Sequence, residues 1–357
     1  METKRLHIDC NAPDQTWEAA LQEGARLLQA GEVVAFPTET VYGLGANAWD
    51  GQACARIFAA KGRPSDNPLI VHVTTVQEAQ QITAAWPETA ALCAAHFWPG
   101  ALTLVLPKAA AVPGEVTAGL ETIAVRVPSH PVARALIARA GCPVAAPSAN
   151  ISGRPSPTNA DHVWQDFQGR IPLVLDAGPC EVGVESTVLD LTETPPVILR
   201  PGGVTRESLE HVLGPILLDD SMEGDQAISG ATVVPKAPGM KYRHYAPRGT
   251  IQIITGTAET VAEQIKLTAD AKTQSLAVFC FTETAVLLGA AAREKIDLLQ
   301  VFGTRTDART GAACLFGALR ACDAQNIELI LAEESGLQGL GLAYMNRLRK
   351  AAGGLKN

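Results

Sequence analysis

Apolar residues recur every three or four positions over residues 16–30, as they do on one face of an amphipathic helix. We expect Gly31 to end that helix, because glycine commonly follows the last helical turn. Residues 33–36 then form a short, apolar and β-branched run that Pro37 interrupts. The pattern predicts a helix, a buried strand and, from Pro37 onward, turn chemistry rather than more sheet.

More apolar runs and alanine-rich amphipathic segments follow in the first half of the chain. The apolar runs predict strands at 69–73, 102–106, 123–127, 144–146, 173–175 and 186–190. The amphipathic segments predict helices near 53–60, 87–96 and 131–140. Strands at this density, interleaved with helices, predict one sizeable mixed and twisted sheet that helices flank.

The regular pattern stops after Leu218 and resumes near residue 250. Prolines, glycines and polar residues accumulate between these points, so we interpret 218–249 as a linker. Beyond it, apolar runs alternate with amphipathic segments. We expect strands at 251–254, 276–281, 298–302 and 327–332, and helices at 258–270, 284–292 and 308–324.

This alternation is typical of right-handed βαβ crossovers and a parallel sheet. The sequence therefore predicts an α/β protein with a larger domain over 1–217 and a smaller, Rossmann-like domain over 250–357. The glycines within 336–341 do not have the spacing of a dinucleotide-binding fingerprint, and we interpret them as structural turns.

Composition excludes several classes of protein. The 357 residues are about twice the usual length of one domain, which agrees with a two-domain chain. Hydrophobic residues make up 47% and charged residues 18%, which excludes a largely disordered chain. Lys and Arg number 29 against 37 Asp and Glu, and this net charge of −8 disfavours broad attachment to nucleic acid or anionic lipid. Any anion site must therefore be local.

The sequence also indicates in which cellular compartment the protein is expected. No window approaches the ~18 uninterrupted apolar residues of a membrane span, and the N-terminus lacks the apolar core of a signal peptide. We expect a cytoplasmic protein without a membrane partner. Its eight cysteines are scattered without a Cys-x-x-Cys pair, so we expect reduced, buried thiols and no structural zinc.

The segment FPTETVYGLG, residues 36–45, is the first that could bind a ligand. A strand that ends at a proline and continues into hydroxyls and glycines lets backbone amides and the Thr40 side chain approach a ligand. A strand–turn–helix corner capped by threonines explains the same residues equally well.

The segment KGRPSDNPLIVH, residues 61–72, carries two cations close together. Lys61 and Arg63 could be only partners of a helix C-terminus. That explanation does not account for the proline-rigid loop around Asn67 or for His72 within an apolar strand. Arg as a bidentate fork and Lys as a mobile point charge suit phosphate oxygens. His72 alone is more often a satisfied core histidine.

A third group of polar residues follows predicted strands. Arg126 lies within an apolar strand, where a charge needs a partner or must reach water, and a substrate carboxylate would serve. PSANISG, residues 147–153, presents a hydroxyl and an amide at the carboxyl edge of a strand, where ligands of open α/β sheets bind. Arg200, before Pro-Gly-Gly, is a further phosphate candidate. The chain has no Walker motif and no Gly-x-Ser-x-Gly elbow.

Six segments taken in order resemble the YrdC-like family, and the tail resembles its long two-domain form. They are FPTETVYGLG, KGRPSDNPLIVH, TIAVRVP, PSANISG, ESTVLD and ILRPGG, supported by PGMKYRHYAP and LGLAYMNRLRKAA. The resemblance implies synthesis of L-threonylcarbamoyladenylate from L-threonine, bicarbonate or CO2, and ATP, with release of pyrophosphate. It also implies Mg²⁺ held by the ATP phosphates, with no protein ligand assigned, and separate proteins that transfer the product to tRNA, with at most weak tRNA contact by this chain.

The resemblance assigns residue roles, carried onto the matching positions. L-Threonine would be held by Thr40, His72, Arg126, Ala146 through its backbone, and Ser186. Lys61 and Arg63 would be catalytic, with Lys61 stabilising the developing phosphate charge. ATP would be held by Lys61, Arg63, Asn67, Thr122, Ser148, Asn150, Ser156, Arg200, His244 and Tyr245.

The predicted linker carries cations and aromatic residues without an acidic residue between 235 and 248. Composition alone fits a solvated tether or an RNA-contacting strip. The resemblance implies instead a lid that closes over the nucleotide and excludes water from a labile mixed anhydride.

Two other functions remain open at this point. A non-catalytic module that binds double-stranded RNA or tRNA would show a salt-dependent gel shift without pyrophosphate release. Carbamoyl transfer in hydrogenase maturation uses a similar domain fused to zinc fingers, and the lack of paired Cys-x-x-Cys motifs speaks against it.

Overall fold

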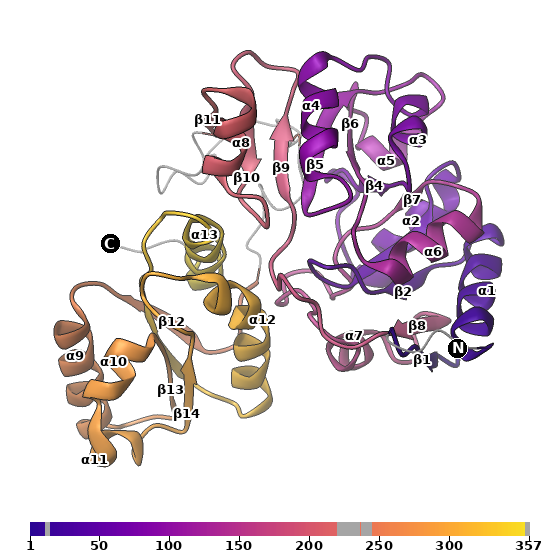
Figure 1. Ribbon diagram of the computed structural model, residues 1–357. Coiled ribbons are helices and arrows are strands. Elements are labelled where there is room, and N and C mark those ends of the chain that lie inside the picture. Colours follow the sequence, from indigo (N-terminus) through magenta and orange to yellow (C-terminus); the bar gives the residue numbers. More distant parts are fainter. Residues whose placement is uncertain (11–14, 220–235, 237–244, 354–357) are drawn as a thin grey trace. The chain divides into compact units, whose positions relative to one another are not determined.

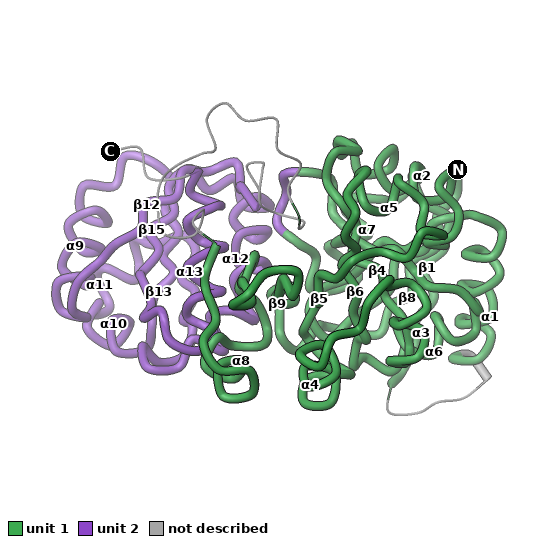
Figure 2. The backbone as a smooth tube through the Cα atoms, turned by 90° about the horizontal axis from the view of Figure 1, so that it is seen from above, with its two compact units in different colours: residues 1–152, 156–242 green, residues 153–155, 243–357 purple. Residues whose placement is uncertain are grey.

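The computed structural model describes residues 1–10, 15–219, 236 and 245–353 of the chain (Figure 1). These residues form two compact units (Figure 2). Unit 1 contains Met1–Ser152 and Ser156–Tyr242, and unit 2 contains Gly153–Pro155 and Arg243–Asn357. The main division falls inside the predicted linker 218–249, most of which lies outside the described residues.

Unit 1 is built on a mixed sheet that has eleven strands within the described residues, in the order β1-β8-β2-β3-β7-β4-β6-β5-β9-β10-β11. Parallel and antiparallel pairs both occur, as the sequence predicts. The strands are β1 (Lys4–His7), β2 (Val34–Phe36), β3 (Gly43–Asn47), β4 (Ile70–His72), β5 (Leu102–Pro107), β6 (Thr122–Arg126), β7 (Val144–Ala145), β8 (Leu173–Asp176), β9 (Thr187–Asp190), β10 (Val197–Arg200) and β11 (Leu217–Leu218).

Helices cover this sheet. They are α1 (Gln15–Gln29), α2 (Gly51–Lys61), α3 (Val76–Gln81), α4 (Glu88–Phe97), α5 (Gly114–Thr117), α6 (Pro131–Ala140), α7 (Ala160–Phe167) and α8 (Arg206–Leu213). The predicted helices near 16–30, 53–60, 87–96 and 131–140 correspond to α1, α2, α4 and α6 and are confirmed.

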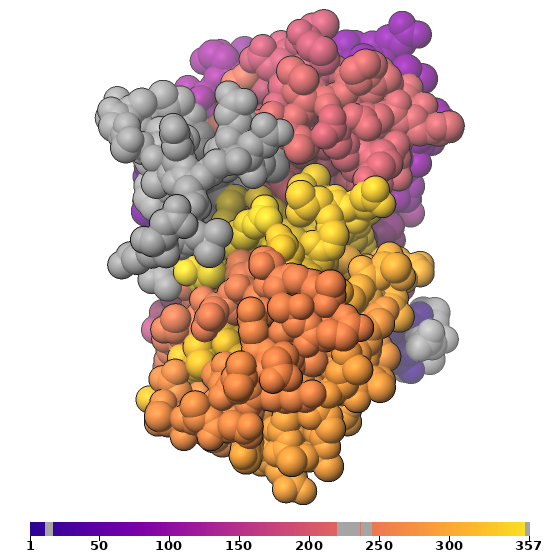
Figure 3. All heavy atoms as spheres, turned by 90° about the vertical axis from the view of Figure 1, so that its left-hand side faces the viewer, coloured from indigo at the N-terminus to yellow at the C-terminus, as the bar shows by residue number. Residues whose placement is uncertain are grey.

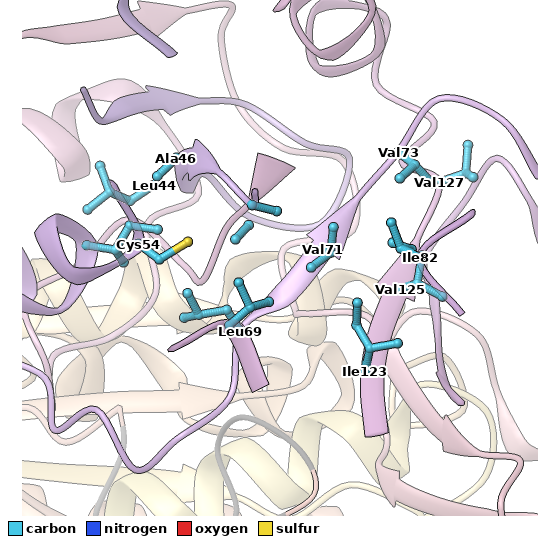
Figure 4. Packing of buried hydrophobic residues seen from close by; sticks show 14 of the residues in the cluster. Leu44, Ala46, Cys54, Leu69, Val71, Val73, Ile82, Ile123, Val125 and Val127 are labelled. Carbon is cyan, nitrogen blue, oxygen red and sulfur yellow. The ribbon is translucent and has the colours of Figure 1, made fainter. Parts of the chain in front are cut away.

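The apolar core of unit 1 lies on both faces of the sheet. On β2, Ala35 joins one hydrophobic cluster, whereas Val34 and Phe36 join another, because successive side chains of a strand point to opposite faces. The first cluster includes Leu44, Val71 and Val125 (Figure 4). The second packs α1 and α6 against the sheet. A sheet covered on both faces explains why its strands read as continuous apolar runs.

Unit 2 has a four-stranded sheet in which every pair is parallel, with the order β12-β15-β13-β14. Its strands are β12 (Thr250–Ile254), β13 (Leu276–Cys280), β14 (Leu298–Val301) and β15 (Leu329–Glu333). Its helices are α9 (Ala258–Asp270), α10 (Thr282–Leu287), α11 (Gly289–Arg293), α12 (Arg309–Ala324) and α13 (Gly341–Ala352). The surface formed by residues 250–300 appears in orange in Figure 3. The predicted parallel Rossmann-like α/β domain is confirmed.

One expectation about the first motif is wrong. Only residues 37–42 form a turn, and the chain then re-enters the sheet as β3, antiparallel to β2. A Cβ on Gly45 would lie 2.6 Å from the Phe36 ring and 2.7 Å from Val144. Gly45 is therefore needed to let an aromatic ring pack on the strand. The glycines of β3 suggest a turn in the sequence, but in the structure they allow neighbouring side chains to pack closely against the strand.

The sequence pattern also misses short elements, among them the edge strands β1 and β11 and the helix α8. None of the helices in the described ranges is both long enough and apolar enough to cross a membrane.

Candidate active site

Helix α2 ends at Lys61, and its side chain is tied to the loop that follows β7. Gly62 caps the helix in the left-handed conformation with φ 59°. The buried Lys61 Nζ donates to the carbonyl oxygens of Ser148 and Asn150 at 2.5 Å each. The Ser152 amide donates to the Lys61 carbonyl at 2.9 Å. The structure thus brings together the two motifs that the sequence singles out, KGR and PSAN.

The PSAN loop is held in a fixed shape. Ser148 Oγ donates to Asn150 Oδ1 at 2.5 Å, and Asn150 Nδ2 donates to the Ile151 carbonyl at 2.9 Å. Backbone bonds join the loop to residues 42–44, because Ala149 N donates to the Tyr42 carbonyl at 2.7 Å. The first and third candidate segments therefore meet.

The loop after α2 folds back on itself. Arg63 NH2 donates to the carbonyl oxygens of Asn67 and Pro68 at 3.2 Å each, and its guanidinium lies 6.0 Å from the centre of the Phe58 ring. Asn67 is 1% exposed, yet its side-chain oxygen and nitrogen have no hydrogen-bond partner among the described residues. A buried amide without a protein partner is costly, and a bound ligand would satisfy it.

Arg126 is buried at the end of β6 and has a protein partner that the sequence interpretation missed. Its NH2 group lies 2.6 Å from Glu39 Oε1, and both side chains are less than 8% exposed. Arg126 NH1 also donates to Thr40 Oγ1 at 2.9 Å, and Nε donates to the Gly100 carbonyl at 3.0 Å. Burial raises the pKa of Glu39, but Arg126 and the backbone N–H groups of Glu39 and Ser129 lower it, so the carboxyl pKa lies below its usual value.

His72 lies beside this ion pair. It pairs directly with Arg126 across β4 and β6, and its ring stands edge-on to Phe36 with 6.4 Å between centroids. Burial, and then the positive charge of Arg126, lower the pKa of His72 to about 3. His72 is therefore neutral at physiological pH. Its buried Nδ1 has no hydrogen-bond partner among the described residues.

Ser186 and Arg200 form a further buried group. Arg200 NH2 donates to the Ser186 carbonyl at 3.0 Å and to Ser186 Oγ at 3.1 Å, and its Nε donates to the same carbonyl at 3.2 Å. The Thr103 and Ser186 hydroxyls are 2.8 Å apart. The predicted ATP residue Arg200 thus fixes the predicted threonine residue Ser186.

Ser156 is fully buried and donates to Glu185 Oε1 at 2.6 Å. Glu185 and Thr103 are, with Glu39, polar residues of this region that the sequence interpretation missed. Glu185 stands beside Ser186 in the ESTVLD motif, so the motif itself was a signal for it.

Strand parity puts Thr122, Arg126 and His72 on the same face of the sheet. Thr122, Ala124 and Arg126 alternate along β6, and Ala124 pairs with Ile70, two residues before His72. Ala124 and Ile70 belong to a small apolar cluster with Val105, Val188 and Leu199. His72 and Arg126 are the last residues of β4 and β6, and the PSAN loop follows the end of β7. The expected site at the carboxyl edge of the strands stays a prediction.

Thr122 and Arg126 stand at opposite ends of β6, about 13 Å apart at the usual rise per strand residue. Two ligands or one elongated ligand could span that length. Ala146 N already donates to the Ile70 carbonyl at 2.9 Å, so a backbone contact from Ala146 would use its carbonyl oxygen.

The two predicted linker contacts differ in what can be said of them. His244 lies outside the described residues. Tyr245 lies in unit 2 and is 5% exposed, with its ring 5.0 Å from that of Phe316 and 5.7 Å from the Arg347 guanidinium. Its contact with ATP stays a prediction. A separate cavity of about 330 Å³ in unit 2, lined by Leu267, Lys272 and Leu329, contains none of the predicted site residues.

Comparisons with known proteins cover the whole chain. A family model described as telomere recombination, of the Sua5, YciO and YrdC proteins, matches residues 26–202, and one described as the C-terminal domain of threonylcarbamoyl-AMP synthase matches 204–353. Threonylcarbamoyl-AMP synthase of Bacillus subtilis is 46% identical, with 99% of each chain covered. That of Pyrococcus abyssi is also 46% identical, with 98% of each chain covered.

Solved structures agree. P. abyssi Sua5 complexed with L-threonine matches with a TM-score of 0.89 and 44% identity, covering 98% of both chains. Escherichia coli YciO is 23% identical with a TM-score of 0.50, covers 56% of this chain and 96% of its own, and shows the fold of unit 1 alone.

Proposed function

This chain belongs to the threonylcarbamoyl-AMP synthase family, and we propose that its reaction takes place in unit 1, between the PSAN loop that Lys61 binds and the turn that Arg126 binds. The substrates are L-threonine, bicarbonate or CO2, and ATP. The amine of threonine attacks the carbon of CO2 to give a carbamate. A carbamate oxygen then attacks the α-phosphorus of ATP, the bond to the β-phosphate oxygen breaks, and pyrophosphate leaves.

One observation carries the assignment of subsites. Two buried cationic groups are linked through the backbone, because Arg126 donates to Thr40 in the turn 37–42, and the PSAN loop that Lys61 binds donates from Ala149 N to the Tyr42 carbonyl at the end of that turn. The first group suits the carboxylate of an amino acid, because a guanidinium binds a carboxylate with two parallel hydrogen bonds. The second suits phosphate, because an ammonium and ordered backbone groups stabilise a developing negative charge.

The division of roles follows the motifs. L-Threonine is held by Thr40, His72, Arg126, Ala146 and Ser186. ATP is held by Arg63, Asn67, Thr122, Ser148, Asn150, Ser156 and Arg200. The buried Asn67 amide and His72 Nδ1 support the proposal, because neither has a hydrogen-bond partner among the described residues and ligand atoms would satisfy both.

Lys61 and Arg63 contribute charge and position rather than a covalent step. Lys61 Nζ donates to two carbonyls of the PSAN loop, which hold its positive charge in place, and that charge would attract the phosphate oxygens of ATP. Transfer of the adenylyl group makes the enzyme a nucleotidyltransferase in this proposal.

Mg²⁺ belongs to the substrate in this proposal. In the described part of the chain, no group of three or more His, Cys, Asp or Glu side chains is placed to hold a metal ion. Glu185 already accepts a hydrogen bond from Ser156. The phosphate oxygens of ATP would therefore hold Mg²⁺, whose charge offsets that of the leaving pyrophosphate. Separate tRNA-modifying proteins would consume the product.

Pyrophosphate release tests the proposal directly. The full-length chain is incubated with ATP and Mg²⁺, with L-threonine and bicarbonate added together or each omitted. We expect release only when both are present, and recovery of a threonylcarbamoyl adenylate by mass spectrometry. Pyrophosphate release that does not depend on threonine or on bicarbonate would show that the substrates are assigned wrongly. A salt-dependent tRNA gel shift without any release would favour an RNA-binding module instead.

A further inference from the structure

We propose that Glu39 binds the α-ammonium group of the amino-acid substrate and so makes the site selective for a zwitterion. This inference rests on the proposed function and adds a specificity residue to it. Glu39 is not among the residues that the sequence motifs assign. It lies in the turn 37–42, between two threonines whose hydroxyls are 2.8 Å apart.

The carboxylate of Glu39 is buried and incompletely satisfied. The residue is 6% exposed, and neither carboxylate oxygen has a hydrogen-bond partner of ordinary geometry among the described residues, although Arg126 and the backbone N–H groups of Glu39 and Ser129 approach closely enough to lower its pKa. Its ion pair with Arg126 supplies charge but leaves lone pairs on both oxygens. A buried carboxylate with free lone pairs is costly unless a further donor arrives. An ammonium group has three donors to offer.

Arg126 has matching spare capacity. Its guanidinium has five N–H groups, of which Nε is used by the Gly100 carbonyl and one on NH1 by Thr40. Together with its contact to Glu39, this leaves donors on both terminal nitrogens for a substrate carboxylate. The substrate carboxylate would then sit on the cation and the substrate ammonium on the anion.

Charge balance selects the substrate class. Arg126 and Glu39 together are neutral, and His72 beside them is neutral, so the empty pocket has no net charge from these three groups. A zwitterion adds no net charge, and its carboxylate and ammonium would face Arg126 and Glu39, respectively. An acid that lacks the amine would bring one unmatched negative charge next to Glu39, which is unfavourable in a buried site.

The Glu39 carboxylate also affects the position of the substrate during carbamate formation, the first chemical step. When the ammonium loses two protons to solvent and adds CO2, a positive group becomes a carbamate anion. Glu39 keeps its negative charge because its pKa is lowered, so it attracts the ammonium and repels the carbamate. The product of the first step is therefore displaced from Glu39, and Lys61 is the cation left to receive it. Glu39 is thus a positioning and specificity residue, not the proton acceptor.

A ratio of affinities tests this role. Dissociation constants for L-threonine and for (2S,3R)-2,3-dihydroxybutanoate, which replaces the amine by a hydroxyl, are measured by calorimetry on the full-length chain. We expect the wild type to prefer L-threonine by at least about tenfold. In Glu39→Gln, which keeps the shape but removes the charge, we expect the preference to fall at least about tenfold, because Arg126 is then uncompensated and favours the anionic acid.

The control is Glu333→Gln, which neutralises a buried glutamate of unit 2 and should leave the ratio unchanged. ATP affinity and thermal unfolding of each variant establish that the site is folded, and the ratio is insensitive to a uniform loss of active protein. An unchanged ratio in folded Glu39→Gln would overturn the inference. Wild-type protein that does not bind L-threonine would instead overturn the proposed function, so the two failures are distinguishable.

Discussion

Lys61 Nζ donates to the carbonyl oxygens of both Ser148 and Asn150, residues 87 and 89 positions away in the chain. The ammonium therefore fixes the loop after β7 and places its positive charge beside that loop. Because the Lys61 side chain is 2% exposed, its charge is only weakly screened by solvent. One side chain thus links the shape of the loop to the charge of the site.

Replacement of Lys61 should remove both effects. We expect Lys61→Ala to lower threonine-dependent pyrophosphate release by about 100-fold or more, the size of effect seen when a preorganised charge-stabilising donor is lost. Lys61→Arg should restore little, since a planar fork cannot place three donors as an ammonium does. Lys272→Ala, an exposed lysine of unit 2, is the matched control. Full activity in Lys61→Ala would contradict the role assigned to it.

Arg200 should couple the two substrates, because it binds both the carbonyl and the hydroxyl of Ser186. Arg200→Lys keeps the charge but loses the fork. We expect the KM values for ATP and for L-threonine both to rise about tenfold, which corresponds to roughly 1.4 kcal/mol for a charge-assisted hydrogen bond. In Arg63→Lys, only the KM for ATP should rise. The coupling would be absent if Arg200→Lys left the KM for threonine unchanged.

His72 should make the stability of unit 1 depend on pH. Its pKa is lowered to about 3 in the folded chain, whereas an unfolded histidine titrates near 6.5. Between these values the unfolded chain binds a proton that the folded chain does not, so the free energy of unfolding falls as the pH falls. At pH 5.5 the loss relative to pH 7.5 should be about 1.4 kcal/mol from this group.

Urea unfolding at the two pH values checks this expectation. His72→Asn carries no titratable ring, so its loss between pH 7.5 and 5.5 should be smaller than that of the wild type by about 1.4 kcal/mol. Other acidic and basic groups contribute equally to both proteins and cancel in the difference. An identical pH dependence in the two proteins would show that His72 is not held neutral.

The sequence patterns predict much of this fold because its helices and strands bury regular runs of apolar residues. Every strand and helix foreseen after residue 250 is present within a few residues, since each has one buried face and a short connection. The meeting of Lys61 with the PSAN loop could be anticipated from the motifs. The atoms that make this contact could not be predicted, because the Lys61 ammonium donates to backbone carbonyl oxygens, which every residue has.

Glu39 shows where pattern reasoning ends. It lies in a polar turn, where a carboxylate is normally solvated, so the sequence gives no reason to predict that it is buried. Its partner Arg126 is 87 positions away, and their contact depends on how β2 and β6 are placed in the sheet. The sequence shows that Arg126 needs a partner, but a substrate and a buried glutamate meet that need equally well until the tertiary structure is known.

Gly45 connects the packing of the sheet to the site, and two alanine substitutions can separate the effects. The added Cβ at Gly45 would meet the Phe36 ring at 2.6 Å, and that ring stands edge-on to His72. Overpacking of this kind typically costs about 1–3 kcal/mol, so we expect Gly45→Ala to lower the free energy of unfolding by that amount. Because Phe36 must move, the KM for L-threonine should rise more than the KM for ATP.

Gly114→Ala is the matched control for that substitution. Gly114 begins α5, and a Cβ there would meet no atom within 4 Å, so the free energy of unfolding should stay unchanged or rise slightly. Chemical unfolding and steady-state kinetics on both variants give the comparison. If Gly45→Ala were as stable as Gly114→Ala and kept its KM for threonine, the close packing of Phe36 on β3 could not be what positions His72.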